Sequence, residues 1–276
     1  MEQFRRGDLV FDVIDAGPAD GPVVVLLHGF PETNTMWQPV IERLTAQGYR
    51  CLAPLQRGYS GGARPKRRRD YRAAELVEDV RALIDESGAQ RVHLVGHDWG
   101  AVVAWYVAQS HPDRLHTVAP LSVPHPAAFL KAIGTSRQAL ASWYMLFFQL
   151  PWIPERTLLH PRVQRGFLAD RADRELGRAE IDAMKEPGAL TAALNWYRAI
   201  PFSRPRDVRK KVTVPTLYVW SDDDIALLEK GAQLCADYVV GDYRFERLSG
   251  SHWIVEEHPD TVSDLLLDWF ATHVRT

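Results

Sequence analysis

The run Pro22–His28, PVVVLLH, restricts the fold of this chain more than any other segment. It is almost continuously apolar, which is typical of a strand that is buried on both faces, as in a parallel sheet. Further strand-like runs alternate with helical patterns as far as Val123, the order expected when helices connect parallel strands. We therefore predict an α/β fold with a mostly parallel sheet flanked by helices.

The pattern changes in the middle of the chain. Residues Ala128–Arg206 contain no convincing strand pattern and are rich in aromatic residues, leucine and arginine, with prolines at the joints. Strand patterns resume at Val212–Trp220 and Tyr243–Gly250, and a helical pattern over Pro259–His273 closes the chain. The middle segment is therefore expected to be helical and inserted into the sheet.

This order predicts two structural units. Residues 1–127 and 207–276 are expected to form the α/β core, and residues 128–206 an inserted helical cap, or lid. A cap in this position would cover the C-terminal ends of the parallel strands, where ligands bind in open α/β sheets.

The composition of the 276 residues narrows the classes of partner. A formal net charge of −2 gives no electrostatic reason to expect nucleic acid or an anionic membrane as partner, and we interpret the basic run Lys66–Arg69 as a solvated loop.

The two cysteines, Cys51 and Cys235, form neither a disulfide framework nor a metal-ligand spacing. The N-terminus lacks the apolar core of a secretory signal. We predict a cytoplasmic protein and leave open whether it forms a homodimer.

The pentapeptide Gly96–Gly100, GHDWG, follows one predicted strand and opens the next predicted helix. The pattern G-x-D-x-G also occurs by chance, but in this context it is typical of a nucleophile elbow. There the flanking glycines relieve crowding and the central side chain is pushed out above the sheet. The start of the helix supplies unpaired N–H groups and a positive dipole end, which favour an ionised carboxylate. We therefore predict that Asp98 is a nucleophile.

A carboxylate nucleophile restricts the chemistry. Its attack on an ester or amide carbonyl would give a mixed anhydride, which is an uphill product. Its attack on a saturated carbon that carries a strained or good leaving group gives an alkyl ester, which water can then cleave. Epoxides and alkyl halides are suitable electrophiles.

Hydrolysis of such an ester requires a base, an orienting acid and an oxyanion hole. His252 follows the last predicted strand, where the base is expected in the chain order nucleophile, acid, histidine. The run Asp222–Asp224 offers three candidates for the acid, and spacing alone does not choose among them. We expect the oxyanion hole to consist of the backbone N–H groups of Trp99, which follows the nucleophile, and Phe30, in the loop after the PVVVLLH strand.

Three segments together resemble the epoxide hydrolases of the α/β-hydrolase fold: HGFPE (His28–Glu32), GHDWG and GSHW (Gly250–Trp253). The resemblance extends over nearly the whole chain, including the cap, although haloalkane and haloacetate dehalogenases share the core motifs. Epoxide hydrolases of this type carry two cap tyrosines that donate hydrogen bonds to the epoxide oxygen. The matching segments here are SWYMLFFQLP, with Tyr144, and ALNWYRAIP, with Tyr197. The resemblance also points to Asp224 as the acid.

The resemblance implies an enzyme that converts a small-molecule epoxide and water to a vicinal diol. An alkyl ester would form on Asp98, and water activated by His252 would hydrolyse it, with no metal or organic cofactor. One departure is Leu55, which stands in APLQRGYS where family members commonly have an acidic residue. The consequence of this departure, the physiological epoxide and the stereochemistry and regiochemistry of its opening stay open.

Two alternatives differ in what they require. A hydrolytic dehalogenase would use the same nucleophile, with Trp99 as a candidate halide contact. A ligand-binding protein on a retired hydrolase scaffold would need no catalytic set, and the intact set Asp98, Asp224 and His252 argues against it.

Overall fold

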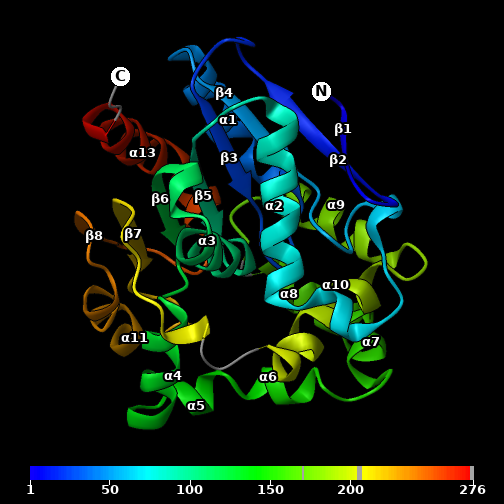
Figure 1. Cartoon of the computed structure of the whole chain (residues 1–276). Helices are drawn as coiled ribbons and strands as arrows, with labels where there is room; N and C mark the ends of the chain where they lie inside the picture. Colours follow the sequence, from blue (N-terminus) through cyan, green and yellow to red (C-terminus); the bar gives the residue numbers. More distant parts are fainter. Residues whose placement is uncertain (170, 204–206, 274–276) are drawn as a thin grey trace.

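The computed structural model describes residues 1–169, 171–203 and 207–273 (Figure 1). The strands are β1 (Gln3–Arg6), β2 (Leu9–Ala16), β3 (Val23–Leu27), β4 (Arg50–Pro54), β5 (Val92–His97), β6 (Leu115–Leu121), β7 (Thr216–Ser221) and β8 (Tyr243–Leu248). They form one sheet in the order β1-β2-β4-β3-β5-β6-β7-β8. The pairs β1–β2 and β2–β4 are antiparallel, and all the other neighbours are parallel. The mostly parallel sheet predicted from the sequence is confirmed.

The helices are α1 (Gln38–Ala46), α2 (Ala73–Ser87), α3 (Trp99–Ser110), α4 (Pro126–Thr135), α5 (Gln138–Ala141), α6 (Trp143–Phe147), α7 (Ile153–Leu158), α8 (Pro161–Ala169), α9 (Arg174–Lys185), α10 (Ala189–Ala199), α11 (Glu229–Gln233), α12 (Ile254–Glu257) and α13 (Pro259–His273). Helices α1 to α11 lie between successive strands along the chain, and α12 and α13 follow the last strand. No helix among the described residues is both long enough and apolar enough to cross a bilayer.

Strand β3 lies inside the sheet, between β4 and β5. Val25 and Leu27 belong to the hydrophobic core on one face of the sheet, while Val24 and Leu26 belong to the core on the other. Since successive side chains of a strand point to opposite faces, a strand covered on both sides needs apolar residues at every position. This explains the unbroken apolar run in the sequence.

Two layers of helices cover the sheet. Val80 of α2 and Val107 of α3 pack into one core, and Figure 1 shows these two helices in front of the strands. Leu44 of α1 and Leu266 of α13 pack into the core on the opposite face. This arrangement leaves the C-terminal ends of the parallel strands free to carry the loops of a site.

The described residues between β6 and β7 form helices and no strand, in agreement with the helical pattern of Ala128–Arg206. Helices α6, α7, α8 and α10 gather beyond the end of the sheet to which the strand arrows point (Figure 1). The first helix, α4, begins at Pro126 and packs against α11, which follows β7. We propose that residues 128–206 form a cap over the sheet. Residues 170 and 204–206 of that range, and residues 274–276 of the expected core, lie outside the described part.

Candidate active site

Asp98 occupies the turn between β5 and α3 with φ 48° and ψ −119°, a backbone conformation that residues other than glycine rarely adopt. A Cβ atom on Gly96 would lie 2.2 Å from the carbonyl oxygen of Gly100, and one on Gly100 would lie 2.1 Å from that of Leu27. The turn is so tight that the residues two positions before and two positions after Asp98 must both be glycine. The geometry of this strained turn places the Asp98 side chain at the end of β5, above the sheet.

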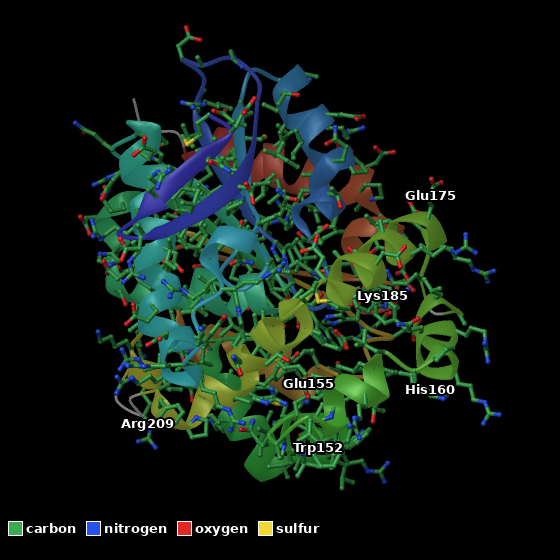
Figure 2. The ribbon with its side chains drawn as sticks, turned by 90° about the vertical axis from the view of Figure 1, so that its right-hand side faces the viewer. Trp152, Glu155, His160, Glu175, Lys185 and Arg209 are labelled. Carbon is green, nitrogen blue, oxygen red and sulfur yellow. The ribbon has the colours of Figure 1, made fainter. Side chains whose placement is uncertain are left out.

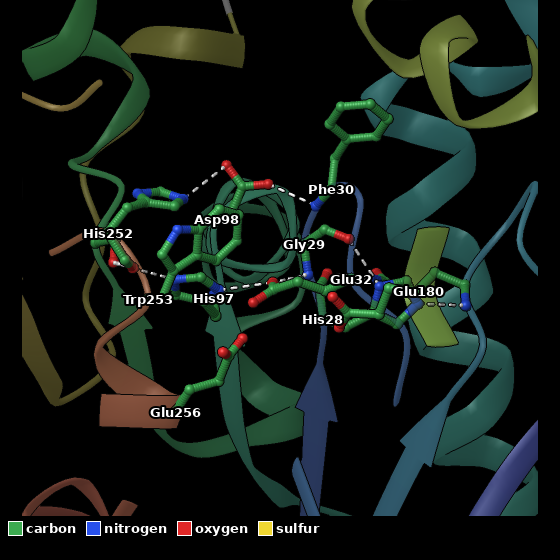
Figure 3. Close-up of polar contacts among 12 residues, drawn as sticks. His28, Gly29, Phe30, Glu32, His97, Asp98, Glu180, His252, Trp253 and Glu256 are labelled. Atoms are coloured by element: carbon green, nitrogen blue, oxygen red, sulfur yellow. Dashed lines mark hydrogen bonds and ion pairs between the residues drawn. The ribbon is translucent and has the colours of Figure 1, made fainter. Parts of the chain in front are cut away.

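The two carboxylate oxygens of Asp98 have different neighbours (Figure 3). Oδ1 accepts a 2.7 Å hydrogen bond from the backbone N–H of Phe30, and Oδ2 lies 3.6 Å from Nε2 of His252. Trp99 is the first residue of α3, so its backbone N–H belongs to the donors that have no partner within the helix. The side chains of Asp98 and His252 remain 13% and 12% exposed, so a small molecule or water can reach them.

His252 lies in the loop between β8 and α12, and its Nδ1–H donates to Oδ2 of Asp224 at 2.7 Å. The other oxygen of Asp224 accepts the backbone N–H groups of Ala226 and Leu227 at 2.8 and 2.9 Å. Of the three neighbouring aspartates, Asp224 is buried and reaches His252, whereas Asp223 is exposed. The acid side chain thus fixes the ring so that Nε2 faces Asp98.

Burial and charge act in opposite directions on these two groups. Burial alone would raise the pKa of Asp224, but the neighbouring His252 and the two backbone donors hold it below its ordinary value. Burial alone would lower the pKa of His252, but Asp224 and then Asp98 raise it well above its ordinary value. The charges of the two carboxylates therefore dominate the protonation of the imidazole.

The two tyrosines lie on different helices of the proposed cap, Tyr144 on α6 and Tyr197 on α10, and their ring centroids are 6.1 Å apart. The Tyr197 ring packs edge-on against Phe30 and Trp99, with centroid distances of 5.6 and 5.0 Å. Burial and the charge of Asp98 raise the pKa of both phenols. Both hydroxyls therefore stay protonated at neutral pH and lie within electrostatic reach of the Asp98 carboxylate.

His97 and Glu32 also belong to the site, and neither residue is predicted to have a function from the sequence. Nδ1 of His97 lies 2.8 Å from Oε2 of Glu32, which also accepts the Gly29 N–H at 3.0 Å. Nε2 of His97 donates to the His252 carbonyl oxygen at 2.9 Å, and Oγ of Ser122 donates to the same oxygen at 3.3 Å. These bonds anchor the backbone of the proposed base. The motifs HGFPE and GHDWG contain both residues, but contacts across 65 positions are not visible in the sequence.

Leu55 is partly buried against the core. The loop that follows it is held by Oγ of Ser60, which donates to the Leu55 carbonyl oxygen at 3.0 Å, and by Arg57. The guanidinium of Arg57 forms a buried, two-pronged ion pair with Asp79 at 2.6 and 2.7 Å. Leu55 thus packs as an apolar residue while its neighbours supply the polar contacts of the loop.

Comparisons with known proteins bear on the family of the chain. The family profile described as the alpha/beta hydrolase fold matches residues 22–259. The chain is 35% identical to the AB hydrolase superfamily protein YfhM of Bacillus subtilis, over 95% of this chain and 94% of that protein. It is 34% identical to Epoxide hydrolase A of Mycobacterium tuberculosis, over 94% of this chain and 93% of that protein.

A solved structure with a similar fold is Epoxide Hydrolase A from Mycobacterium thermoresistibile. It has a TM-score of 0.83 and 27% sequence identity, and the match covers 98% of this chain and 97% of that one. The elbow, the sheet order and these similarities lead to one conclusion: the chain belongs to the α/β-hydrolase fold family, together with the epoxide hydrolases that it resembles.

Proposed function

We propose that the protein is an epoxide hydrolase that converts a small-molecule epoxide to a vicinal diol through an ester on Asp98. The observation that carries the proposal is the position of two tyrosines beside the Asp98 elbow. The Tyr197 ring packs against Phe30 and Trp99, which flank the Asp98 carboxylate, and the Tyr144 ring lies 6.1 Å from the Tyr197 ring. A carboxylate suits displacement at saturated carbon, and phenols suit the oxygen that such a displacement releases. The similarity to curated epoxide hydrolases supports the same reaction.

In the first half-reaction, Oδ2 of Asp98 attacks a carbon of the epoxide ring. The carbon–oxygen bond breaks, and its electron pair moves to the ring oxygen. Tyr144 and Tyr197 donate hydrogen bonds to this oxygen and one of them delivers a proton, which stabilises an alkoxide that is a poor leaving group in water. The products are an alkyl ester on Asp98 and a free hydroxyl group.

In the second half-reaction, Nε2 of His252 takes a proton from a water molecule whose oxygen attacks the ester carbon, Cγ of Asp98. Negative charge develops on Oδ1, where the N–H groups of Phe30 and Trp99 stabilise it. The bond between Cγ and Oδ2 then breaks, and the imidazolium returns its proton to the departing diol oxygen. The new carboxyl group gives its hydroxyl proton to the tyrosinate left by ring opening, so the carboxylate, the imidazole and both phenols are regenerated. Asp224 stabilises the imidazolium through its bond to Nδ1.

Ester formation also prepares the base for its task. In the free protein the charge of Asp98 contributes to the raised pKa of His252. The ester carries no charge, so ester formation removes the contribution of Asp98 and lowers the pKa of His252 toward the neutral form that acts as a base.

The decisive experiment measures, in parallel, the opening of epoxides to diols and the release of halide from alkyl halides. We expect diol from a panel of aryl and alkyl epoxides and little halide from matched alkyl halides. Asp98→Asn should abolish turnover of the panel, whereas Asp223→Asn, at the exposed aspartate, should not. Halide release without diol would instead favour a dehalogenase, and no reaction of either class with Asp98 would favour a binding protein.

A further inference from the structure

A buried cluster of ionisable side chains lies between the cap and the loop that carries His252. Arg171, between α8 and α9, has no exposed side-chain surface. Its guanidinium binds Oε2 of Glu180, on α9, at 2.7 Å, and Oε2 of Glu256, on α12, at 3.0 Å, with a second contact to Oε1 of Glu256. Glu180 is fully buried and Glu256 is 2% exposed. The cluster therefore joins the cap to the core without solvent.

The same guanidinium stacks on the residue that follows the proposed base. Its carbon lies 4.1 Å from the ring centroid of Trp253, which is a cation–π contact. The Trp253 ring in turn meets the His252 ring edge-on at 5.1 Å, and Phe167 of α8 meets Trp253 at 5.5 Å. Trp253 thus contacts both the guanidinium of Arg171 and the imidazole of His252.

The cluster also reaches the loop that carries Phe30. The backbone of Thr33, three residues after Phe30, is close enough to Glu180 to lower the pKa of its carboxyl. Both loops that surround the Asp98 carboxylate therefore lie near the same buried cluster on the cap. Figure 3 shows Glu180, Glu256 and Trp253 beside the Asp98 site.

Stability alone is a weak reason for such a cluster. The desolvation of a buried ion pair offsets much of its attraction, so apolar packing would hold the cap at least as well. The planar guanidinium fork, however, binds a carboxylate in one orientation and stacks on an aromatic face, so it fixes direction as well as distance. Asp224 fixes the rotation of the His252 ring, while Arg171 restrains the residues that follow it, Trp253 and Glu256.

We propose that Arg171 is a positioning residue for ester hydrolysis: by binding Glu256 and stacking on Trp253 it sets the position of His252 relative to Asp98. The inference rests on the proposed function. Ester formation depends on Asp98 and the two tyrosines, whereas ester hydrolysis depends on His252. Loss of Arg171 should therefore slow the second half-reaction more than the first.

The test follows both half-reactions in single-turnover experiments with excess enzyme and a processed aryl epoxide, by mass spectrometry of the ester and chromatography of the diol. In Arg171→Met we expect ester hydrolysis to slow by about 10- to 100-fold, the effect of a misplaced catalytic group, with ester formation within about threefold of normal. The ester should then accumulate. Arg171→Lys should restore part of the hydrolysis rate, and Arg178→Met, at an exposed arginine of α9, should behave as the unaltered protein.

Each other outcome has a defined meaning. An equal loss of both half-reactions in a folded Arg171→Met protein, or no accumulation of ester, overturns the positioning role. If that variant does not fold, Arg171→Lys and Glu256→Gln, which keep charge or shape, decide by the same criterion. If His252→Gln forms no ester either, the proposed function fails, and the inference with it. Ester in His252→Gln but in none of the cluster variants overturns the inference alone.

Discussion

The backbone N–H of Phe30 donates a 2.7 Å hydrogen bond to Oδ1 of Asp98, and this bond distinguishes the two oxygens of one carboxylate. Oδ1 is held where negative charge would develop during hydrolysis of an ester on Asp98. Oδ2 keeps a 3.6 Å separation from Nε2 of His252, which leaves it the less constrained oxygen for attack. A single side chain can therefore act as nucleophile in one step and carry the oxyanion in the next.

Replacing His252 with glutamine should separate the two half-reactions. The variant keeps Asp98 and the tyrosines, so the ester should form, but without a base it should persist. Mass spectrometry of the intact protein should show the added mass of the epoxide, located on the peptide that contains Asp98. His160→Gln, at an exposed histidine on the outer side of the cap (Figure 2), should turn over without an adduct. An unmodified His252→Gln protein would contradict the two-step scheme.

Removing both phenol hydroxyls should suppress ring opening. The double variant Tyr144→Phe with Tyr197→Phe keeps the aromatic packing but loses both donors, and each donor to a developing oxyanion contributes about 100- to 1000-fold. We expect ester formation to slow by at least about 100-fold, with a smaller effect on hydrolysis of a preformed ester. Tyr49→Phe, at a ring that packs on Phe270 away from the site, provides the control. Near-normal epoxide turnover in the double variant would remove the case against a dehalogenase.

Glu180 should make the protein less stable as the pH rises. Burial first, and then Glu32 and Glu256, raise the pKa of its carboxyl to about 9 against the opposing effect of Arg171. The unfolded chain loses this proton near pH 4.5 and the folded protein keeps it to about pH 9, so the proton-dependent stability is lost progressively between these values.

Glu180→Gln removes this titration and keeps the shape of the protonated group. Its stability relative to the unaltered protein should increase with pH between about 5 and 9, by at most about 1.4 kcal/mol per pH unit. Urea denaturation at both ends of the range measures the difference. Glu175→Gln, at an exposed glutamate of α9, should show no such trend, and a pH-independent effect of Glu180→Gln would mean that the carboxyl is ionised in the folded protein.

The buried His93 should weaken the protein in acid. Burial lowers its pKa to about 3, and His116 and His273 contribute in the same direction. The unfolded chain takes up a proton near pH 6.5, but the folded protein does not do so until about pH 3, so stability falls as the pH falls through this range. His93→Gln should reduce the slope of unfolding free energy against pH between about 6.5 and 4. An unchanged slope in denaturant titrations would show that other groups cause the acid sensitivity.

Gly29 should be irreplaceable because of Asp98. A Cβ atom at Gly29 would lie 2.4 Å from Cβ and 2.6 Å from Oδ1 of Asp98, closer than real atoms approach. Gly29→Ala should therefore displace Asp98 or the Phe30 loop and reduce ester formation by about 100-fold or more. Gly134→Ala, in α4, has nothing within 4 Å and should leave activity intact, with stability unchanged or raised by up to about 1 kcal/mol. Retained activity in a folded Gly29→Ala protein would show that the carboxylate does not require this position.

The local pattern of the sequence determined the α/β architecture. The apolar run Pro22–His28 predicted a strand buried on both faces, and β3 has that environment. The helix expected over Pro259–His273 has those bounds in the structure. Strand β1, which forms a hairpin with β2, was not predicted from the sequence. Its charged residues Arg5 and Arg6 give no alternating apolar pattern over so short a strand. The spacing of apolar residues shows which face of a helix or strand is buried. It therefore predicts an element well when the element is long and buried on one face, or when it is buried on all sides.

Only the tertiary structure decided how the residues of the site meet. Spacing left Asp222–Asp224 equivalent and only the family resemblance pointed to Asp224, whereas in the structure the turn after β7 brings Asp224 to His252. The contact of Arg171 with Glu256 joins positions 85 residues apart, on the cap and on the core. Such contacts depend on strand order and on how the cap docks, and neither is encoded by the periodicity of a single segment. The sequence pattern of a segment indicates which of its residues are buried. Contacts between charged residues that are far apart in the sequence depend on how the segments pack in the folded protein.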